Sequence, residues 1–342
     1  MKVSLSVIIP VYNGARWLRP ALDSVLNQRF DESLEVIVVD DGSTDGSAAI
    51  VDAMRRKHAA LKLLLNEHNH GIVRSLNRGL DAAQGRFIAR MDADDICLPS
   101  RFARQLSFLQ AGKADLCGTW FIEFGKGIPR AVRWPNTETA LRASMLFQNS
   151  IFHPSIMARR EVFDCYRYRD EYRLAEDYDL FARAMTGFRI ANVPEVLLRY
   201  RRHAQQATQA QRSPMEAVTR RIRLEVLAAE GITTTEDEQR LHNLVRAPHS
   251  LTNIDDLLGI EAWLNRLYQL YDDADAKRVI ASQWVRACIR AAPLGSKMLK
   301  TYRASNLRGG TRTMIDLSAL AAMKLDYGSK AFAVLRRLGL SA

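Results

Sequence analysis

Short apolar runs alternate with helical patterns along residues 4–91. The apolar runs are rich in Val, Ile and Leu and cover residues 4–11, 35–39, 61–65 and 87–91. Runs without polar alternation are typical of strands that are buried on both faces. Because strands that alternate with helices form βαβ units, the pattern predicts a mostly parallel sheet with helices on both sides. The first half of the chain is therefore expected to be an open α/β fold.

The pattern changes twice further along the chain. Residues 116–124 and 152–157 have the composition of strands, and residues 137–146 have a helical pattern. After His203 the pattern is almost entirely helical, and Ser213-Pro214-Met215-Glu216 has the features of a capping box with Pro at the first helical position. We therefore expect an α/β domain over residues 1–205 and an all-helical region over residues 206–342.

Charge and cysteine content limit the class of protein. The net charge is +11, and residues 277–342 hold thirteen Lys or Arg and two Asp, which accounts for the whole surplus. The four cysteines include no CxxC pair, which disfavours a structural zinc site or a disulfide framework and favours a reducing compartment. No apolar run reaches the roughly 18 residues that a membrane span needs. We expect a cytoplasmic protein, either soluble or peripheral on the inner face of the plasma membrane.

Polar residues follow three of the predicted strands directly. They are Pro10-Val11-Tyr12-Asn13, Asp40-Asp41 and Asp92-Ala93-Asp94-Asp95. In parallel sheets ligands bind beyond the carboxyl ends of the strands, so these segments should line one crevice. Carboxylates that end a buried strand are costly unless they are neutralised, and a divalent cation with phosphate oxygens on its far side would do this. The alternative is an Asp-rich turn that caps the helix after Pro99, and the triplet by itself does not decide between them.

Five signals in a fixed order decide between these two interpretations. They are Ser6-Val-Ile-Ile-Pro-Val-Tyr-Asn13, Val38-Val-Asp-Asp-Gly-Ser-Thr-Asp45, Asn69-His-Gly71 with Ser75-Leu-Asn-Arg-Gly79, Arg90-Met-Asp-Ala-Asp-Asp95, and Ala175-Glu-Asp-Tyr-Asp-Leu180 followed by Tyr200-Arg-Arg-His203. Together they resemble glycosyltransferase family 2 over residues 4–203. The resemblance implies the GT-A fold, a Rossmann-like sheet flanked by helices, and a nucleotide-sugar donor.

The resemblance also implies roles for the residues of the crevice. It makes Asp94 the direct ligand of a Mn²⁺ or Mg²⁺ ion and Asp92 a contact to the ribose or the metal. It makes Asp41 an acceptor for a base N–H, with Asp40 beside it. The remaining residues at this end, which would line the base pocket, are Pro10, Tyr12 and Asn13.

The chain departs from the family at one position. Family members commonly carry an Arg just before the Asn of the third signal, where this chain has Leu76. Arg90 and Arg74 are candidate replacements, because a guanidinium group suits diphosphate oxygens.

The last motif supplies a second chemical centre. The family pattern makes Asp177 the base that takes the acceptor hydroxyl proton, with Glu176 placing it or binding the acceptor. The alternative is solvated charge at a helix start, where acidic residues favour the helix dipole. His203 is either a metal ligand or a surface histidine, and His153 is expected to be structural or to lie on the acceptor side.

The basic tail has two interpretations. Val279, Trp284 and Ile289 with Arg286 and Arg290 have the pattern of an amphipathic basic helix, as do, less clearly, residues 330–338. Such helices either lie on anionic membrane surfaces or pack in a helical core or a homo-oligomer.

The sequence thus predicts an inverting, metal-dependent hexosyltransferase that uses a UDP-sugar. The expected acceptor is a hydroxyl group of a glycan or of a lipid-linked molecule in cell-surface polysaccharide synthesis. The alternatives are a nucleotidyltransferase acting on sugar phosphates and a basic nucleic-acid-binding protein. The sequence contains no RRM, helix-turn-helix or zinc pattern, which disfavours the nucleic-acid-binding alternative, so no nucleic-acid partner is expected.

Overall fold

The computed structural model describes residues 3–203 and 212–337. The chain divides into two compact units, of which unit 1 holds residues 1–141 and 149–222 and unit 2 holds residues 142–148 and 223–342. The domain boundary predicted at residues 205 and 206 lies outside the described residues.

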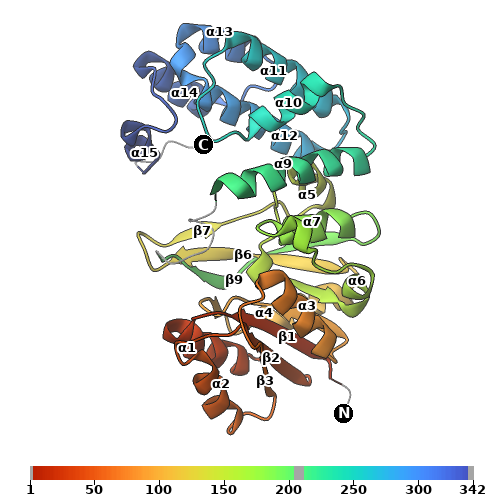
Figure 1. The fold of residues 1–342 in the computed structure, drawn as a ribbon. Helices are drawn as coiled ribbons and strands as arrows, with labels where there is room; N and C mark the ends of the chain where they lie inside the picture. The colour runs from red at the N-terminus through yellow and green to blue at the C-terminus, as the bar shows by residue number, and fades with distance from the viewer. Residues whose placement is uncertain (1–2, 204–211, 338–342) are drawn as a thin grey trace. The chain divides into compact units, whose positions relative to one another are not determined.

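Unit 1 is built on one sheet. In the described part of the chain nine strands form it, in the order β3-β2-β1-β4-β8-β6-β9-β5, with β7 paired to β6 (Figure 1). The strands are β1 (Leu5–Val11), β2 (Leu34–Asp40), β3 (Leu61–Leu65), β4 (Phe87–Arg90), β5 (Ile96–Cys97), β6 (Leu116–Phe124), β7 (Arg130–Val132), β8 (Met157–Arg159) and β9 (Ile190–Arg201). The first four pair in parallel, as the apolar runs predicted.

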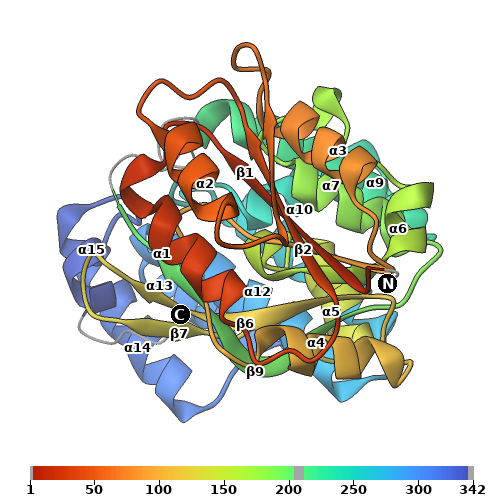
Figure 2. The same cartoon turned by 90° about the horizontal axis from the view of Figure 1, so that it is seen from below.

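Helices cover both faces of this parallel part. The helices of unit 1 are α1 (Ala15–Leu26), α2 (Ser47–Arg55), α3 (Ile72–Ala82), α4 (Arg101–Gln110), α6 (Arg160–Cys165) and α7 (Glu176–Ala184), with α5 (Glu138–Met145) and α9 (Arg212–Ala229) divided between the units. Val7 and Ile9 of β1 belong to the core cluster that α1, α2 and α4 complete. Ile8 points to the other face, where a Cβ on Gly79 of α3 would lie 2.5 Å from it, so α3 needs glycine there to pack closely. Figure 2 shows α1 and α2 on one side of β1 and β2, and α3 on the other.

The sheet continues with strands of mixed direction. β8 is antiparallel to β4 and to β6, β9 is parallel to β6, and β5 is antiparallel to β9. The strand predicted over residues 152–157 is wrong in its bounds. His153–Ser155 is a single 3-10 turn, and the strand begins only at Met157. Pro154 explains the difference, because proline cannot donate a hydrogen bond to a neighbouring strand.

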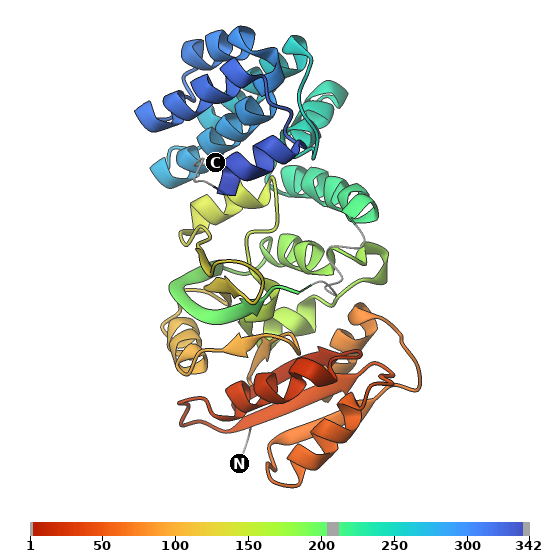
Figure 3. The same cartoon turned by 90° about the vertical axis from the view of Figure 1, so that its left-hand side faces the viewer.

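Unit 2 is helical throughout its described residues (Figure 3). Its helices are α10 (Glu236–Val245), α11 (Ile254–Gln269), α12 (Ala274–Arg290), α13 (Ser296–Ala304), α14 (Thr311–Met323) and α15 (Lys330–Arg337). α10 begins with a capping box between Thr235 and Glu238. None of the helices in the described ranges is long and apolar enough to cross a bilayer.

Helix α12 is the basic amphipathic helix that the sequence predicted. Trp284 and Ile289 are buried in unit 2, and so is Arg290, whose guanidinium donates to the carbonyl oxygens of Leu244, Val245 and His249. This stripe of α12 therefore packs in a helical core, which is the second of the two interpretations.

The buried side chain of His242 holds the short segment 142–148, which belongs to unit 2. Nε2 of His242 donates to the Leu146 carbonyl oxygen over 2.8 Å, and Nδ1 accepts from Nε1 of Trp263 over 3.1 Å. Burial lowers the pKa of His242 to about 4, so the ring is neutral in the folded protein.

We expect the stability of the protein to depend on the protonation of His242. The unfolded chain takes up this proton below about pH 6.5, whereas the folded chain resists it, so the stabilisation is complete above that pH and is lost as the pH falls toward 4. The expected loss between pH 7 and pH 5 is about 2 kcal/mol, measured by urea denaturation. His242→Gln should remove this part of the pH dependence, and His249→Gln, at an exposed histidine, should keep it. Equal pH slopes in the wild type and His242→Gln would contradict the assignment.

Candidate active site

A cavity of about 660 Å³ lies beyond the carboxyl ends of β1, β2 and β4. Most of the residues predicted for the site line it: Pro10, Tyr12, Asn13, Asp41, Arg90, Asp92, Asp94, Glu176, Asp177 and His203. Of the predicted residues, all within the described ranges, Asp40 and Arg74 do not line it. The fold therefore brings the first and the last of the sequence signals to one place.

Asp41 organises one wall of the cavity. Its Oδ1 accepts from Asn66 Nδ2 over 2.6 Å and from the His70 backbone N–H over 2.9 Å, and its Oδ2 accepts from the Gly71 N–H over 2.8 Å. The carboxylate is buried, so these donors offset the cost of taking it out of water. It fixes the loop that enters α3 and leaves one side of Oδ2 for a further donor.

The neighbouring residues have different surroundings. Asp40 is buried, and its Oδ1 accepts from the Ser43 N–H over 2.7 Å, so it supports the turn after β2. Tyr12 is 53% exposed and presents its ring at the cavity, where it can stack on a planar group. Asn13 has a φ of +51°, and its Oδ1 accepts from the Thr44 N–H, which joins the turns after β1 and β2.

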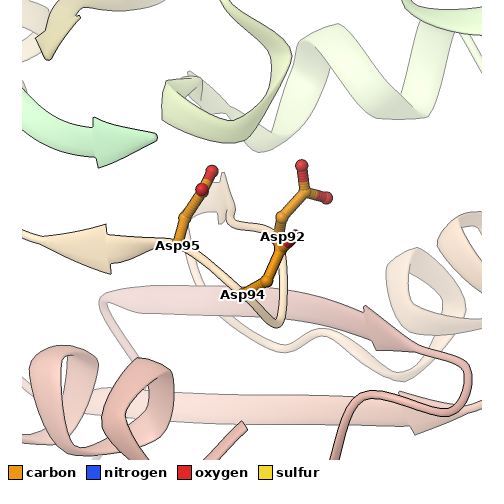
Figure 4. A group of neighbouring side chains, drawn as sticks. All are labelled: Asp92, Asp94 and Asp95. Atoms are coloured by element: carbon orange, nitrogen blue, oxygen red, sulfur yellow. The ribbon is translucent and has the colours of Figure 1, made fainter. Parts of the chain in front are cut away.

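Three aspartates stand on the turn that follows β4 (Figure 4). Asp92, Asp94 and Asp95 each place a carboxylate oxygen within 4.8 Å of the other two. Asp92 is paired with Arg90 over 2.5 Å, and Asp94 Oδ2 lies 2.7 Å from His203 Nε2.

Asp95 differs from the other two because it is fully buried. Its Oδ1 accepts from the Arg201 N–H over 2.9 Å, and Arg201 Nε donates to the Asp94 carbonyl oxygen over 2.8 Å. Asp95 thereby ties the acidic turn to the end of β9, two residues before His203. Burial raises the pKa of Asp95 well above its usual range, and the charges of Asp92 and Asp94 add to this effect.

The acidic turn fits a divalent cation. Asp92 and Asp94 are partly exposed to the cavity, at 30% and 24% of their side-chain surface. Carboxylate oxygens are the ligands that hard cations prefer, and an imidazole such as that of His203 also suits Mn²⁺. Burial raises the pKa of Asp92, with Asp94 adding to the effect, so a nearby positive charge would relieve the crowding of like charges.

The two arginine candidates lie in different places. Arg90 is buried at the floor of the cavity, where it pairs with Asp92. Arg74 is 64% exposed and pairs with Asp170 over 3.2 Å. A third arginine, Arg173, lines the cavity beside Gly71, and its guanidinium makes no hydrogen bond or ion pair with any described residue.

A second acidic pair lies in the first turn of α7. Asp177 Oδ1 accepts from the Tyr178 N–H over 2.7 Å, and its Oδ2 accepts from Asn149 Nδ2 over 2.7 Å. Glu176 accepts from the Leu174 N–H over 3.1 Å. Burial raises the pKa of Asp177, and burial together with the charge of Asp177 raises the pKa of Glu176 to about 7. A carboxyl group with a pKa near 7, as in Glu176, can take up or release a proton near neutral pH.

His153 supports this part of the cavity. Its Nε2 lies 2.8 Å from the Tyr168 hydroxyl, and burial lowers its pKa well below the usual range, so it is a neutral buried ring. Leu174 lines the cavity with a φ of +85°, a conformation that leucine rarely adopts.

Sequence reasoning missed Asn149, Arg173 and Trp17. The guanidinium groups of Arg16 and Arg201 lie 4.4 and 4.1 Å from the ring centre of Trp17, and this ring is 6.1 Å from that of His203. Arg173 stands just before the Ala175-Glu176-Asp177 signal, so its position could have indicated a role. Asn149 and Trp17 have no local pattern of their own.

The sequence is similar to known glycosyltransferases. A family model described as Glycosyl transferase family 2 matches residues 6–167. The amylovoran biosynthesis glycosyltransferase AmsE of Erwinia amylovora is 31% identical over 201 residues, which cover 57% of this chain and 75% of AmsE.

The fold is also similar to solved structures. Residues 1–349 of S. aureus TarS, in complex with UDP-GlcNAc, align with a TM-score of 0.55 and 19% identity over 94% of this chain and 92% of that one. The mannosyltransferase PcManGT from Pyrobaculum calidifontis, in complex with GDP-Man and Mn²⁺, aligns with a TM-score of 0.51 and 20% identity over 95% and 87%. At these identities the likeness concerns the fold, which is GT-A.

The hydrogen bonds of Asp41 are expected to stabilise the folded protein. Asp41→Asn places an amide NH₂ where the carboxylate now meets N–H donors, so we expect a loss of about 1–3 kcal/mol in the free energy of unfolding. Asp52→Asn should leave the free energy of unfolding nearly unchanged, because the partners of Asp52 in the described structure, Arg55 and Arg56, are exposed and such pairs contribute little. Urea denaturation of both variants measures this, and equal losses would contradict the assigned role of Asp41.

Proposed function

The chain belongs to glycosyltransferase family 2, and from this premise we propose that it transfers a sugar from a UDP-sugar to a hydroxyl group with inversion. The observation that carries the proposal is the pair of separate acidic centres in one cavity, with Asp94 on one and Asp177 on the other. One centre would bear the charge of the leaving diphosphate and the other would accept a proton. Family membership also favours this function over the nucleotidyltransferase alternative.

The donor would bind with its nucleoside against the ends of β1 and β2. Tyr12 would stack on the base, and Asp41 would accept a base N–H through the free side of Oδ2. Pro10 and Asn13 would line the same pocket, with Asp40 supporting it from behind. TarS was solved with UDP-GlcNAc, which agrees with a UDP-sugar, and PcManGT with GDP-Man, which makes GDP-sugars the donors to compare.

A Mn²⁺ or Mg²⁺ ion would be held by Asp94, with Asp92 and His203 beside it. When bound, such an ion stabilises the negative charge of the diphosphate without proton transfer. Asp95 would keep Asp94 and the His203 segment in place through Arg201.

Arginines would complete the neutralisation of the diphosphate. Arg90 holds Asp92 from the floor of the cavity. Arg173 has its guanidinium group uncommitted among the described residues and is the better replacement for the arginine that the family usually carries at the place of Leu76. Arg74, which pairs with Asp170, would contribute only at longer range.

Asp177 would act as the base in a single displacement. As the acceptor oxygen forms its bond to the anomeric carbon, the bond to the diphosphate breaks, and the hydroxyl proton moves to Asp177. One displacement inverts the anomeric configuration. Glu176, with its raised pKa, would bind the acceptor or hold Asp177 in position.

The acceptor would be a glycan or a lipid-linked molecule. AmsE is named for amylovoran biosynthesis and as a glycosyltransferase, which agrees with an acceptor in glycan synthesis. The basic charge of residues 277–342 would favour an anionic membrane surface that carries such an acceptor.

Retention of the protein on anionic liposomes at low salt would support this membrane association, and the absence of retention would argue against it.

The metal site predicts a change in Mn²⁺ affinity. Asp94→Asn replaces a charged oxygen ligand by a neutral one, so we expect Mn²⁺ binding, measured by calorimetry in the presence of UDP, to weaken at least about tenfold. Asp23→Asn, at a half-buried aspartate outside the cavity, should leave the affinity unchanged. Equal affinities in the wild type and Asp94→Asn would remove Asp94 as a ligand.

The base assignment predicts a loss of turnover. A thermal-shift panel of UDP- and GDP-sugars with Mn²⁺ would first identify the donor that stabilises the protein most. The rate of hydrolysis of that donor, measured as the nucleoside diphosphate released, should fall about 10²–10⁴-fold in Asp177→Asn. The thermal shift should persist in this variant, because Asp177 is not assigned to the donor. Turnover at the wild-type rate would mean that Asp177 is not the base.

A further inference from the structure

We propose that Asn149 is a positioning residue that fixes the Asp177 carboxylate by donating a hydrogen bond to one of its oxygens. The proposal rests on the assignment of Asp177 as the base and adds a residue that the family signals in the sequence did not contain. Asn149 lines the same cavity.

The orientation of the Asn149 side chain follows from its own partners. Its Oδ1 accepts from the Ile151 N–H over 3.0 Å, which directs the amide nitrogen the other way. That nitrogen, Nδ2, lies 2.7 Å from Asp177 Oδ2. The other oxygen, Oδ1, accepts from the Tyr178 N–H at the start of α7. Each oxygen of the carboxylate therefore accepts from a neighbouring residue, and the N–H of Asp177 itself is a further donor to the group. A carboxylate has about four acceptor positions, so one remains for a proton.

The backbone next to Asn149 is held in place within unit 1. Downstream, the Ser150 carbonyl oxygen accepts from Asn192 Nδ2 over 2.9 Å. A side chain on such a segment loses little further freedom when it makes a hydrogen bond, so its geometry can be specific.

The charges around Asp177 give this hydrogen bond a chemical consequence. Glu176 lies on the same helix, and Arg90 and Asp92 lie on and after β4, with the Tyr168 hydroxyl also nearby. Burial raises the pKa of Asp177, whereas Arg90 and the amide of Asn149 lower it. Asn149 is neutral, so its replacement by another neutral residue changes no net charge in the cavity. Its loss should therefore raise the pKa of Asp177.

The pH dependence of donor hydrolysis tests the role. We expect the acidic limb of the kcat/KM profile to move up by about one pH unit in Asn149→Leu. At low pH this shift is about a tenfold loss of kcat/KM, and above the shifted limb kcat/KM returns to the wild-type value. Asn149→Asp should move the limb further, because a second carboxylate would face Asp177. The control is Asn27→Leu, which removes a hydrogen bond to the Asp23 carbonyl oxygen at an exposed position outside the cavity and should leave the limb in place. A loss in Asn149→Leu that is equal at every pH would overturn the proposal.

A second measurement does not depend on turnover. The side-chain amide protons of Asn149, identified in NMR spectra by their absence in Asn149→Leu, should shift with pH as Asp177 titrates. The step should vanish in Asp177→Asn. No step in the wild type, or a step that persists in Asp177→Asn, would overturn the hydrogen bond. Wild-type turnover in Asp177→Asn would instead remove the base while leaving the NMR result standing, so the two failures are distinguishable.

Discussion

The cost of placing carboxylates at the ends of buried strands governs the structure around the cavity. Asp41, Asp92 and Asp95 all follow strands that are covered on both faces, where an unpaired charge is expensive. Each is offset by a different part of the chain: Asp41 by the loop before α3, Asp92 by Arg90, and Asp95 by the backbone of Arg201. Because the donors come from separate elements, neutralising the acids also joins the walls of the cavity.

The carboxylates around the cavity differ in how far they are exposed to it. Asp95 and Asp41 are buried, whereas Asp92 and Asp94 keep part of their surface open. Arg90 lies between the acidic turn and the pair on α7, where it reduces repulsion between the two groups. The proposed binding of a diphosphate and a cation would need such a balance, because full neutralisation by the protein would leave no charge for ligands.

At the position of Leu76 the chain lacks the arginine that family members commonly carry, and a different arginine is proposed to supply the charge. The sequence offered Arg74 and Arg90 as substitutes because they are near in the chain or next to the acidic turn. The structure separates them: Arg74 pairs with Asp170, Arg90 is committed to Asp92, and Arg173 lines the cavity without a described partner. A positive charge acts through space, so any wall of the cavity can supply it.

The sequence by itself determined the parallel strands, the helices between them and the aspartates at their ends, because burial periodicity and turn residues are local properties of the chain. It also carried the family signals on which the proposed roles of Asp94 and Asp177 rest. The tertiary structure decided the pairing and the direction of β8, β6 and β9 and the 3-10 turn at His153. It also decided the contacts of Asn149 with Asp177 and of Arg201 with Asp95. These depend on which distant segments meet, and no local period records the pairing of residues that lie 28 or 106 positions apart.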